Sequence, residues 1–93
     1  MTGASVPAGI DLPGVFSGPV KRSITIAGHQ TSISLEPPFW SALEQAARAR
    51  GLPLSALVGA IDALRVKQPH PPNLASTIRC WLLIASENLS QQP

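Results

Sequence analysis

The side chains that could serve as nucleophiles, proton carriers or metal ligands are few and lie far apart in the sequence. Cys80 is the single cysteine of the 93-residue chain, and its two histidines are His29 and His70. No Cys-x-x-Cys or His-x-x-x-His spacing arises, although zinc sites use such spacings. No cluster of serine, histidine and carboxylate, no phosphate-cradling glycine loop and no carboxylate pair emerges either. The sequence therefore predicts neither a metal site nor a cofactor, and we do not expect an enzyme.

The surroundings of Cys80 are apolar, in the run Arg79-Cys80-Trp81-Leu82. A single thiol in such a run is more often a small buried hydrophobic side chain than a nucleophile. Because disulfides accumulate in oxidising compartments, a chain with one cysteine is expected in a reducing one. No charged segment precedes an apolar run at the N-terminus, and the longest apolar stretch, 81–85, is too short to cross a bilayer. These features predict a soluble, cytoplasmic protein without a membrane partner.

A different chemistry, hydrogen bonding along an exposed face, is indicated between Gln30 and Leu35, where polar and apolar residues alternate. Successive side chains of an extended strand point to opposite faces. Gln30, Ser32 and Ser34 therefore share one face, and Ile33 and Leu35 share the other. We expect the apolar face to pack in a core and the polar face to be free for contact.

The elements that must position this strand begin with a second alternating segment, residues 21–26, and a bend at 27–29. A lone strand leaves amides and carbonyls unpaired along both edges, so it must find a partner strand. Two partners are possible. Residues 21–26 can form a hairpin with the strand, or the identical strand of a second chain can pair with it about a two-fold axis.

Two helices are predicted after the strand. The first starts at the Pro37-Pro38 pair, which the first helical turn tolerates, and runs to about Arg50, where Gly51 stops it. The second opens after Leu52-Pro53 and ends near Lys67. Apolar residues recur at spacings of three and four in both.

Beyond the stiff segment 68–72, Asn73 is predicted to cap a third helix that runs to about Glu87. Its broad apolar surface, which includes Trp81, implies burial on more than one side. Charged pairs are predicted at helical spacing between Glu44 and Arg48 in the first helix and between Asp62 and Arg65 in the second.

The size and composition of the chain favour one small domain that associates with another copy. Apolar residues make up 44% and charged residues 13% of the sequence, so apolar surface must be covered. A core of this size contributes about 3 to 5 kcal/mol, and neither disulfides nor a metal supplement it. We expect a Pro- and Gly-rich flexible arm over 1–20, the domain over 21–89 and a frayed tail over 90–93. The net charge of +2 permits contact with a polyanion without requiring it.

Several segments together resemble a bacterial ribbon-helix-helix group of DNA-binding proteins, over about Lys21 to Ile84. The segments that carry the resemblance are Lys21-Arg22-Ser23, Gly28-His29-Gln30-Thr31-Ser32, Ile33-Ser34-Leu35-Glu36, Phe39-Trp40, Ala49-Arg50-Gly51-Leu52, Leu57, Ile61-Asp62 and Asn73-Leu74. The resemblance implies a mainly α fold with one short β-ribbon. It also implies an intertwined homodimer, to which this chain adds a C-terminal helix.

The resemblance also implies site residues, because such dimers lay their ribbon in the major groove of DNA. The outward side chains Gln30, Ser32 and Ser34 would read base edges, since glutamine can bond bidentately to adenine and serine to either base type. The implied phosphate contacts are Lys21, Arg22, His29 and the start of the second helix at Leu54 and Ser55. The implied dimer core is Ile33, Leu35, Trp40, Leu43, Leu57 and Ile61.

Two positions depart from the pattern of the group. Pro53 stands where a capping serine or threonine is usual, and Gln30 stands where an arginine is expected. One hydroxyl, one amide and one strong guanine or phosphate contact are thereby absent.

The leading hypothesis from the sequence is a homodimeric, sequence-specific DNA-binding protein that regulates transcription and binds double-stranded DNA at paired half-sites. The alternative is a protein-interaction or oligomerisation module, including an antitoxin-like one. Such a module would use the dimer fold and the apolar third helix to hold a partner or to form a tetramer.

Overall fold

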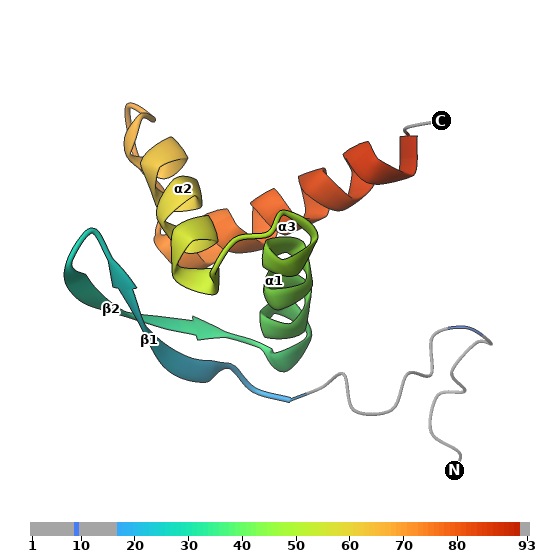
Figure 1. Cartoon of the computed structure of the whole chain (residues 1–93), viewed down its shortest axis with the longest axis horizontal. Helices are drawn as coiled ribbons and strands as arrows, with labels where there is room; N and C mark the ends of the chain where they lie inside the picture. The colour runs from blue at the N-terminus through green and yellow to red at the C-terminus, as the bar shows by residue number, and fades with distance from the viewer. Residues whose placement is uncertain (1–8, 10–16, 92–93) are drawn as a thin grey trace, which may run out of the picture.

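The structure is a computed structural model that describes residue 9 and residues 17–91, with only the backbone of 89–91. Its elements are β1 (Val20–Ile26), β2 (His29–Leu35), α1 (Pro37–Ala49), α2 (Leu54–Val66) and α3 (Leu74–Gln91). The prediction of a mainly helical fold with one short ribbon and an additional C-terminal helix is confirmed (Figure 1).

The ribbon is a hairpin formed within one chain. β1 and β2 pair antiparallel, and the register sets Ile26 opposite His29, so that only Ala27 and Gly28 form the loop. Both loop residues have positive φ, 51° and 82° respectively. Positive φ at both central positions is the requirement of a type I′ turn, whose twist matches that of the flanking strands. Of the two possible strand partners, the structure therefore shows the chain's own residues 20–26.

The helix boundaries follow from local signals in the sequence. Pro37 and Pro38 occupy the first turn of α1, as predicted. The helix ends where Gly51 adopts a φ of 64°, and the amide of Leu52 donates to the carbonyl of Ala47 at 2.9 Å. Asn73 caps α3 through a hydrogen bond of 2.7 Å from the amide of Ser76 to its side-chain oxygen, as predicted.

The ends of the predicted segments need small corrections. α1 and α2 each end one residue before the expected position, and α3 continues to Gln91 instead of stopping near Glu87. Residues 90 and 91, predicted as a frayed tail, thus belong to α3. Val20, predicted as part of the arm, begins β1. Residues 1–8, 10–16 and 92–93 lie outside the described part of the structure. Most of the predicted arm over 1–20 and the end of the predicted tail over 90–93 therefore fall outside it.

The core lies between the inner face of the ribbon and the three helices. Ile24, Ile33 and Leu35 of the ribbon are 8%, 2% and 0% exposed. α2 packs on β1, while α3 packs on β2 and contributes Ile78 and Leu82 to the same cluster. The chain's own helices therefore cover the apolar face of the ribbon.

The residues predicted to form the dimer core are already buried within a single chain. These six residues, Ile33, Leu35, Trp40, Leu43, Leu57 and Ile61, are each at most 4% exposed. The reason is α3, because this helix lies against β2 and fills space that the sequence interpretation left for a second chain. A partner is not needed to bury these side chains, and their role in a dimer stays a prediction.

Other packing predictions are divided. The ion pair of Asp62 with Arg65 is confirmed at 2.8 Å. Glu44 pairs instead with Arg22 of β1, at 3.3 Å, so its predicted partner Arg48 is wrong. Cys80, predicted to be buried, is exposed, because helical spacing places it on the other side of α3 from the buried Ile78 and Leu82. No helix in the described ranges is both long and apolar enough to span a membrane.

Candidate nucleic-acid interface

The outer face of the ribbon carries six polar side chains in three cross-strand pairs. The register sets Lys21 opposite Ser34, Ser23 opposite Ser32, and Thr25 opposite Gln30. All are exposed except the partly buried Ser34. In Figure 1 the helices lie together on one side of the hairpin, which leaves its other side uncovered.

The functional groups of this face are free for an external ligand. None of the six side chains makes a hydrogen bond or an ion pair with another described residue. Hydroxyl groups donate and accept hydrogen bonds, and the amide of Gln30 does both through different atoms. The outer face is therefore an array of donors and acceptors that have no partner in the described part of the chain, with Lys21 as its only full charge.

The sequence interpretation named four of these six residues, Gln30, Ser32 and Ser34 as base contacts and Lys21 as a phosphate contact. Gln30, Ser32 and Ser34 do lie together on the outward face of β2. Ser23 and Thr25 were missed as site residues, although their alternation with Ile24 and Ile26 was visible in the sequence. The sequence did not show which residues of β2 they would face, and the hairpin register now places Ser23 opposite Ser32 and Thr25 opposite Gln30.

The adjacent basic residues Lys21 and Arg22 lie on opposite faces. Arg22 points to the helices, where its guanidinium carbon lies 4.5 Å from the ring centroid of Trp40 and its Nη1 lies 3.3 Å from Oε1 of Glu44. The indole N–H of Trp40 donates to the carbonyl of Val20 at 2.8 Å. These contacts fix the start of β1 on α1 and leave the charge of Arg22 largely compensated.

The remaining predicted phosphate contacts lie at the ends of elements. His29 is exposed beside the hairpin turn. Ser55 is exposed and Leu54 half-buried at the start of α2, which has no side-chain cap because its N-cap residue is Pro53. The carbonyl of Pro53 accepts hydrogen bonds from the amides of Ala56 and Leu57, at 3.1 and 3.2 Å. The amides of Leu54 and Ser55 are left at the positive end of the helix dipole.

The charges of the molecule leave a positive excess on its surface. Arg22, Arg65 and Arg79 each pair with a carboxylate. Lys21, Arg48, Arg50 and Lys67 pair with no carboxylate of the described residues. More than half of the seven basic side chains are thus available to attract an anion.

Glu36 ties the end of the ribbon to α3. Its carboxylate oxygens lie 3.1 and 3.4 Å from Nε and Nη2 of Arg79, and the guanidinium carbon lies 5.6 Å from the ring centroid of Phe39. The pKa of Glu36 lies below its ordinary value. The larger cause is a hydrogen bond from its own backbone amide, and the second is the hydrogen bond from Arg79. The carboxylate therefore stays charged where β2 passes into α1.

The described residues bring together no group of three or more His, Cys, Asp or Glu side chains that could hold a metal ion. The arrangement suits binding through hydrogen bonds and charge.

Comparison with known proteins identifies one family. No curated protein and no solved structure matches the chain. A family model described as a ribbon-helix-helix domain matches residues 19–85, which span β1, β2, α1, α2 and most of α3. This match covers well over half of the chain and includes the whole outer face of the ribbon. The protein therefore belongs to the ribbon-helix-helix domain family.

Proposed function

We propose that this protein is a sequence-specific DNA-binding protein that regulates transcription by laying the outer face of its β1–β2 ribbon in the major groove. Ribbon-helix-helix domains generally bind DNA as transcription regulators and are a non-enzymatic fold. The observation that carries the proposal is the array of three polar pairs on the outer face, none of them engaged within the described chain.

The dimensions and chemistry of the ribbon suit this groove. The major groove of B-DNA is about 12 Å wide and admits a two-stranded ribbon, whose strands lie about 4.8 Å apart. Gln30, with its amide, is the side chain suited to bond bidentately to adenine. Ser32 and Ser34 contact neighbouring base edges, and because their side chains are short, the backbone must come close to the bases.

Phosphates on either side of the groove hold the ribbon in register. Lys21 neutralises one phosphate directly, and His29 lies at the other end of the ribbon. The free amides of Leu54 and Ser55 meet another phosphate at the N-terminus of α2. Arg22 has a smaller part, because Glu44 already compensates its charge.

The protein acts as a homodimer on paired half-sites. Dimers are typical of the family. Two copies related by a two-fold axis present two equivalent ribbons, so the preferred DNA site is itself two-fold symmetric.

A titration of genomic DNA fragments, followed by the selected site, tests the proposal. The double variant Gln30→Ala with Ser32→Ala should lose about tenfold or more in affinity for the selected site, because a good bidentate base contact is worth about 1 to 3 kcal/mol. The matched control is Gln45→Ala with Ser41→Ala, which makes the same changes on the exposed face of α1. This control should keep wild-type affinity.

Two results would overturn the proposal. One is the absence of any salt-sensitive binding to genomic fragments. The other is a ribbon double variant that binds the selected site as tightly as its α1 control.

A further inference from the structure

We propose that a groove between α2 and α3 binds a small aromatic carboxylic acid. The α2–α3 groove is defined by its lining from the end of α2, the 68–72 loop and α3: Leu64, Arg65, Gln68, Pro69, His70, Pro72, Ser76, Thr77, Cys80, Trp81 and Ile84. No residue of β1 or β2 belongs to this lining. The inference therefore goes beyond the proposed function and does not depend on it.

The groove has the size and composition of a small-molecule site. Its volume is about 610 Å³. Sites for small organic ligands measure about 300 to 1,000 Å³ and are mostly apolar, with a few polar groups that orient the ligand. Leu64 on α2 is 50% exposed and Ile84 on α3 is 56% exposed, so both helices present apolar surface that the described chain leaves open.

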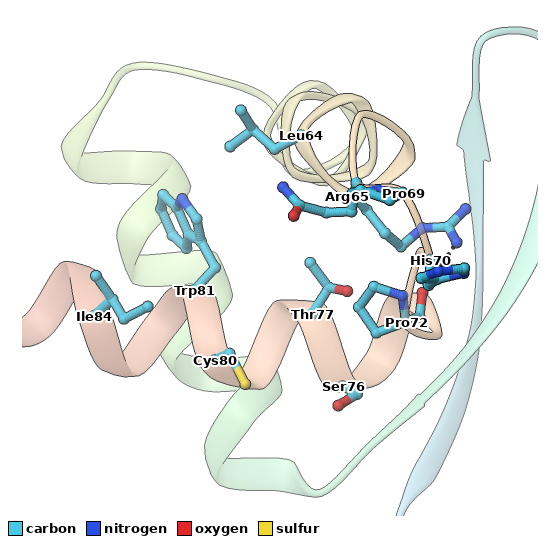
Figure 2. A pocket seen from close by; sticks show the side chains of 11 residues that line it. Leu64, Arg65, Pro69, His70, Pro72, Ser76, Thr77, Cys80, Trp81 and Ile84 are labelled. Carbon is cyan, nitrogen blue, oxygen red and sulfur yellow. Dashed lines mark hydrogen bonds between the residues drawn. The ribbon is translucent and has the colours of Figure 1, made fainter.

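Trp81 gives the groove an aromatic wall. Figure 2 shows Thr77 and Trp81 pointing from α3 towards α2, with Leu64 above them. The guanidinium carbon of Arg50 lies 5.0 Å from the centroid of the indole ring, and Arg50 is not part of the lining. This cation therefore contacts the ring from outside the groove. The surface of the ring inside the groove is left for an aromatic ligand to pack against.

Hydrogen-bond donors lie at the opposite end of the groove from the aromatic wall. In Figure 2, Arg65 and His70 lie at one end and Trp81 at the other. Nε of Arg65 donates to Oδ1 of Asp62 at 2.8 Å, and its Nη1 donates to the carbonyl of Pro72 at 3.1 Å. These bonds hold the guanidinium in place, while its Nη2 makes no hydrogen bond with a described residue. A positioned guanidinium with free N–H groups is a strong donor to a carboxylate.

The charges of the lining favour an acid over a base. The lining contains Arg65 and His70 but no aspartate or glutamate. Asp62 compensates the charge of Arg65. Lys67, which follows Arg65 by two positions, pairs with no carboxylate of the described residues, so a positive excess remains beside the groove. A carboxylate bound here meets donors and an opposite charge, whereas an ammonium group would meet neither.

The indole N–H groups of the two tryptophans report directly on this site. That of Trp81 makes no hydrogen bond with a described residue, whereas that of Trp40 donates to the carbonyl of Val20 at 2.8 Å and lies in the core. Nuclear magnetic resonance resolves both signals during a titration with naphthoate, an aromatic carboxylate. The Trp81 signal should shift and saturate below about 1 mM ligand, and the Trp40 signal should stay in place as the internal control.

Two neutral or positive analogues of the same ring separate the carboxylate from the apolar body. Naphthamide has the ring without the negative charge, and naphthylmethylamine carries a positive charge instead. Naphthoate should bind about tenfold or more tightly than either, because hydrogen bonds to a charged acceptor are stronger than neutral ones.

Two pairs of variants assign the ends of the groove. Arg65→Gln should weaken naphthoate about tenfold and leave naphthamide nearly unchanged, whereas Arg48→Gln, the same change at an exposed position of α1, should bind both as wild type does. Leu64→Ala should weaken both ligands about threefold or more, because it removes apolar contact. Its matched control is Leu52→Ala, which lies 40% exposed outside the groove. Circular dichroism verifies that each variant is folded.

Four results would overturn the inference. The first is a Trp81 signal that does not shift or does not saturate with naphthoate, and the second is naphthamide that binds as tightly as naphthoate. The third is an equal loss of naphthoate affinity in Arg65→Gln and Arg48→Gln. The fourth is a Trp81 signal that shifts with protein concentration alone, which would assign the groove to another copy of the chain. DNA binding is scored separately with the Gln30 and Ser32 variants, so none of these results decides the proposed function.

Discussion

At the scale of single residues, the pair Lys21 and Arg22 shows how strand alternation separates two identical charges. Lys21 lies on the outer face without an ion pair, and Arg22 lies on the inner face between Trp40 and Glu44. Each substitution to alanine removes one positive charge, so the two variants have the same net charge. Any difference between them in DNA binding therefore reports position and not total charge.

We predict that Lys21→Ala lowers the salt dependence of DNA binding more than Arg22→Ala does. The slope of log affinity against log salt concentration should fall by about 0.9 for each phosphate contact that is lost. Arg22→Ala should instead lower the free energy of unfolding by about 1 kcal/mol or less, because it removes one exposed ion pair and one cation–π contact. Affinities measured over a range of salt concentrations, together with urea denaturation, check both. An equal loss of slope in the two variants would place Arg22 on the DNA.

At the scale of elements, the hairpin turn places an alanine in a backbone conformation that alanine does not favour. Ala27 has a φ of 51°, in the left-handed region that costs a side-chain-bearing residue about 1 to 2 kcal/mol. Asparagine tolerates this region, and Asn-Gly is the preferred pair of a type I′ turn. The turn sets the register of the ribbon, and the register pairs the six polar side chains of the outer face.

Ala27→Asn should therefore stabilise the protein by about 1 kcal/mol, which for a domain of this size raises Tm by about 4 to 8 °C. The control is Ala63→Asn on an exposed position of α2, where asparagine is the poorer helix former and Tm should fall. Thermal unfolding followed by circular dichroism measures both. A lower Tm for Ala27→Asn would contradict the type I′ geometry of the hairpin.

At the scale of the whole molecule, the sequence predicted what depends on neighbours along the chain. The alternation around Ser32, the stop at Gly51, the cap at Asn73 and the pair of Asp62 with Arg65 all rest on residues within four positions of one another, and each agrees with the structure. Such features follow from local backbone geometry and helical spacing.

What the sequence missed depends on how distant segments pack. The pairing of Glu44 with Arg22 and the covering of β2 by α3 join residues far apart in the chain. Cys80 is exposed because helical spacing places it on the other side of α3 from the buried Ile78 and Leu82. Which side of this apolar helix is covered depends on the packing of distant segments. The outer face of β2 was predicted because alternation within one strand determines it. The contribution of Ser23 and Thr25 was not predicted, because it depends on how β1 pairs with β2.

Nuclear magnetic resonance of the side-chain amides shows whether the outer face of the ribbon contacts DNA. In a titration with the selected DNA site, the NH₂ signals of Gln30 should shift strongly. Those of Gln45 on α1 and Gln68 after α2 should stay in place and serve as internal controls. Shifts at Gln45 or Gln68 with Gln30 unchanged would contradict the account.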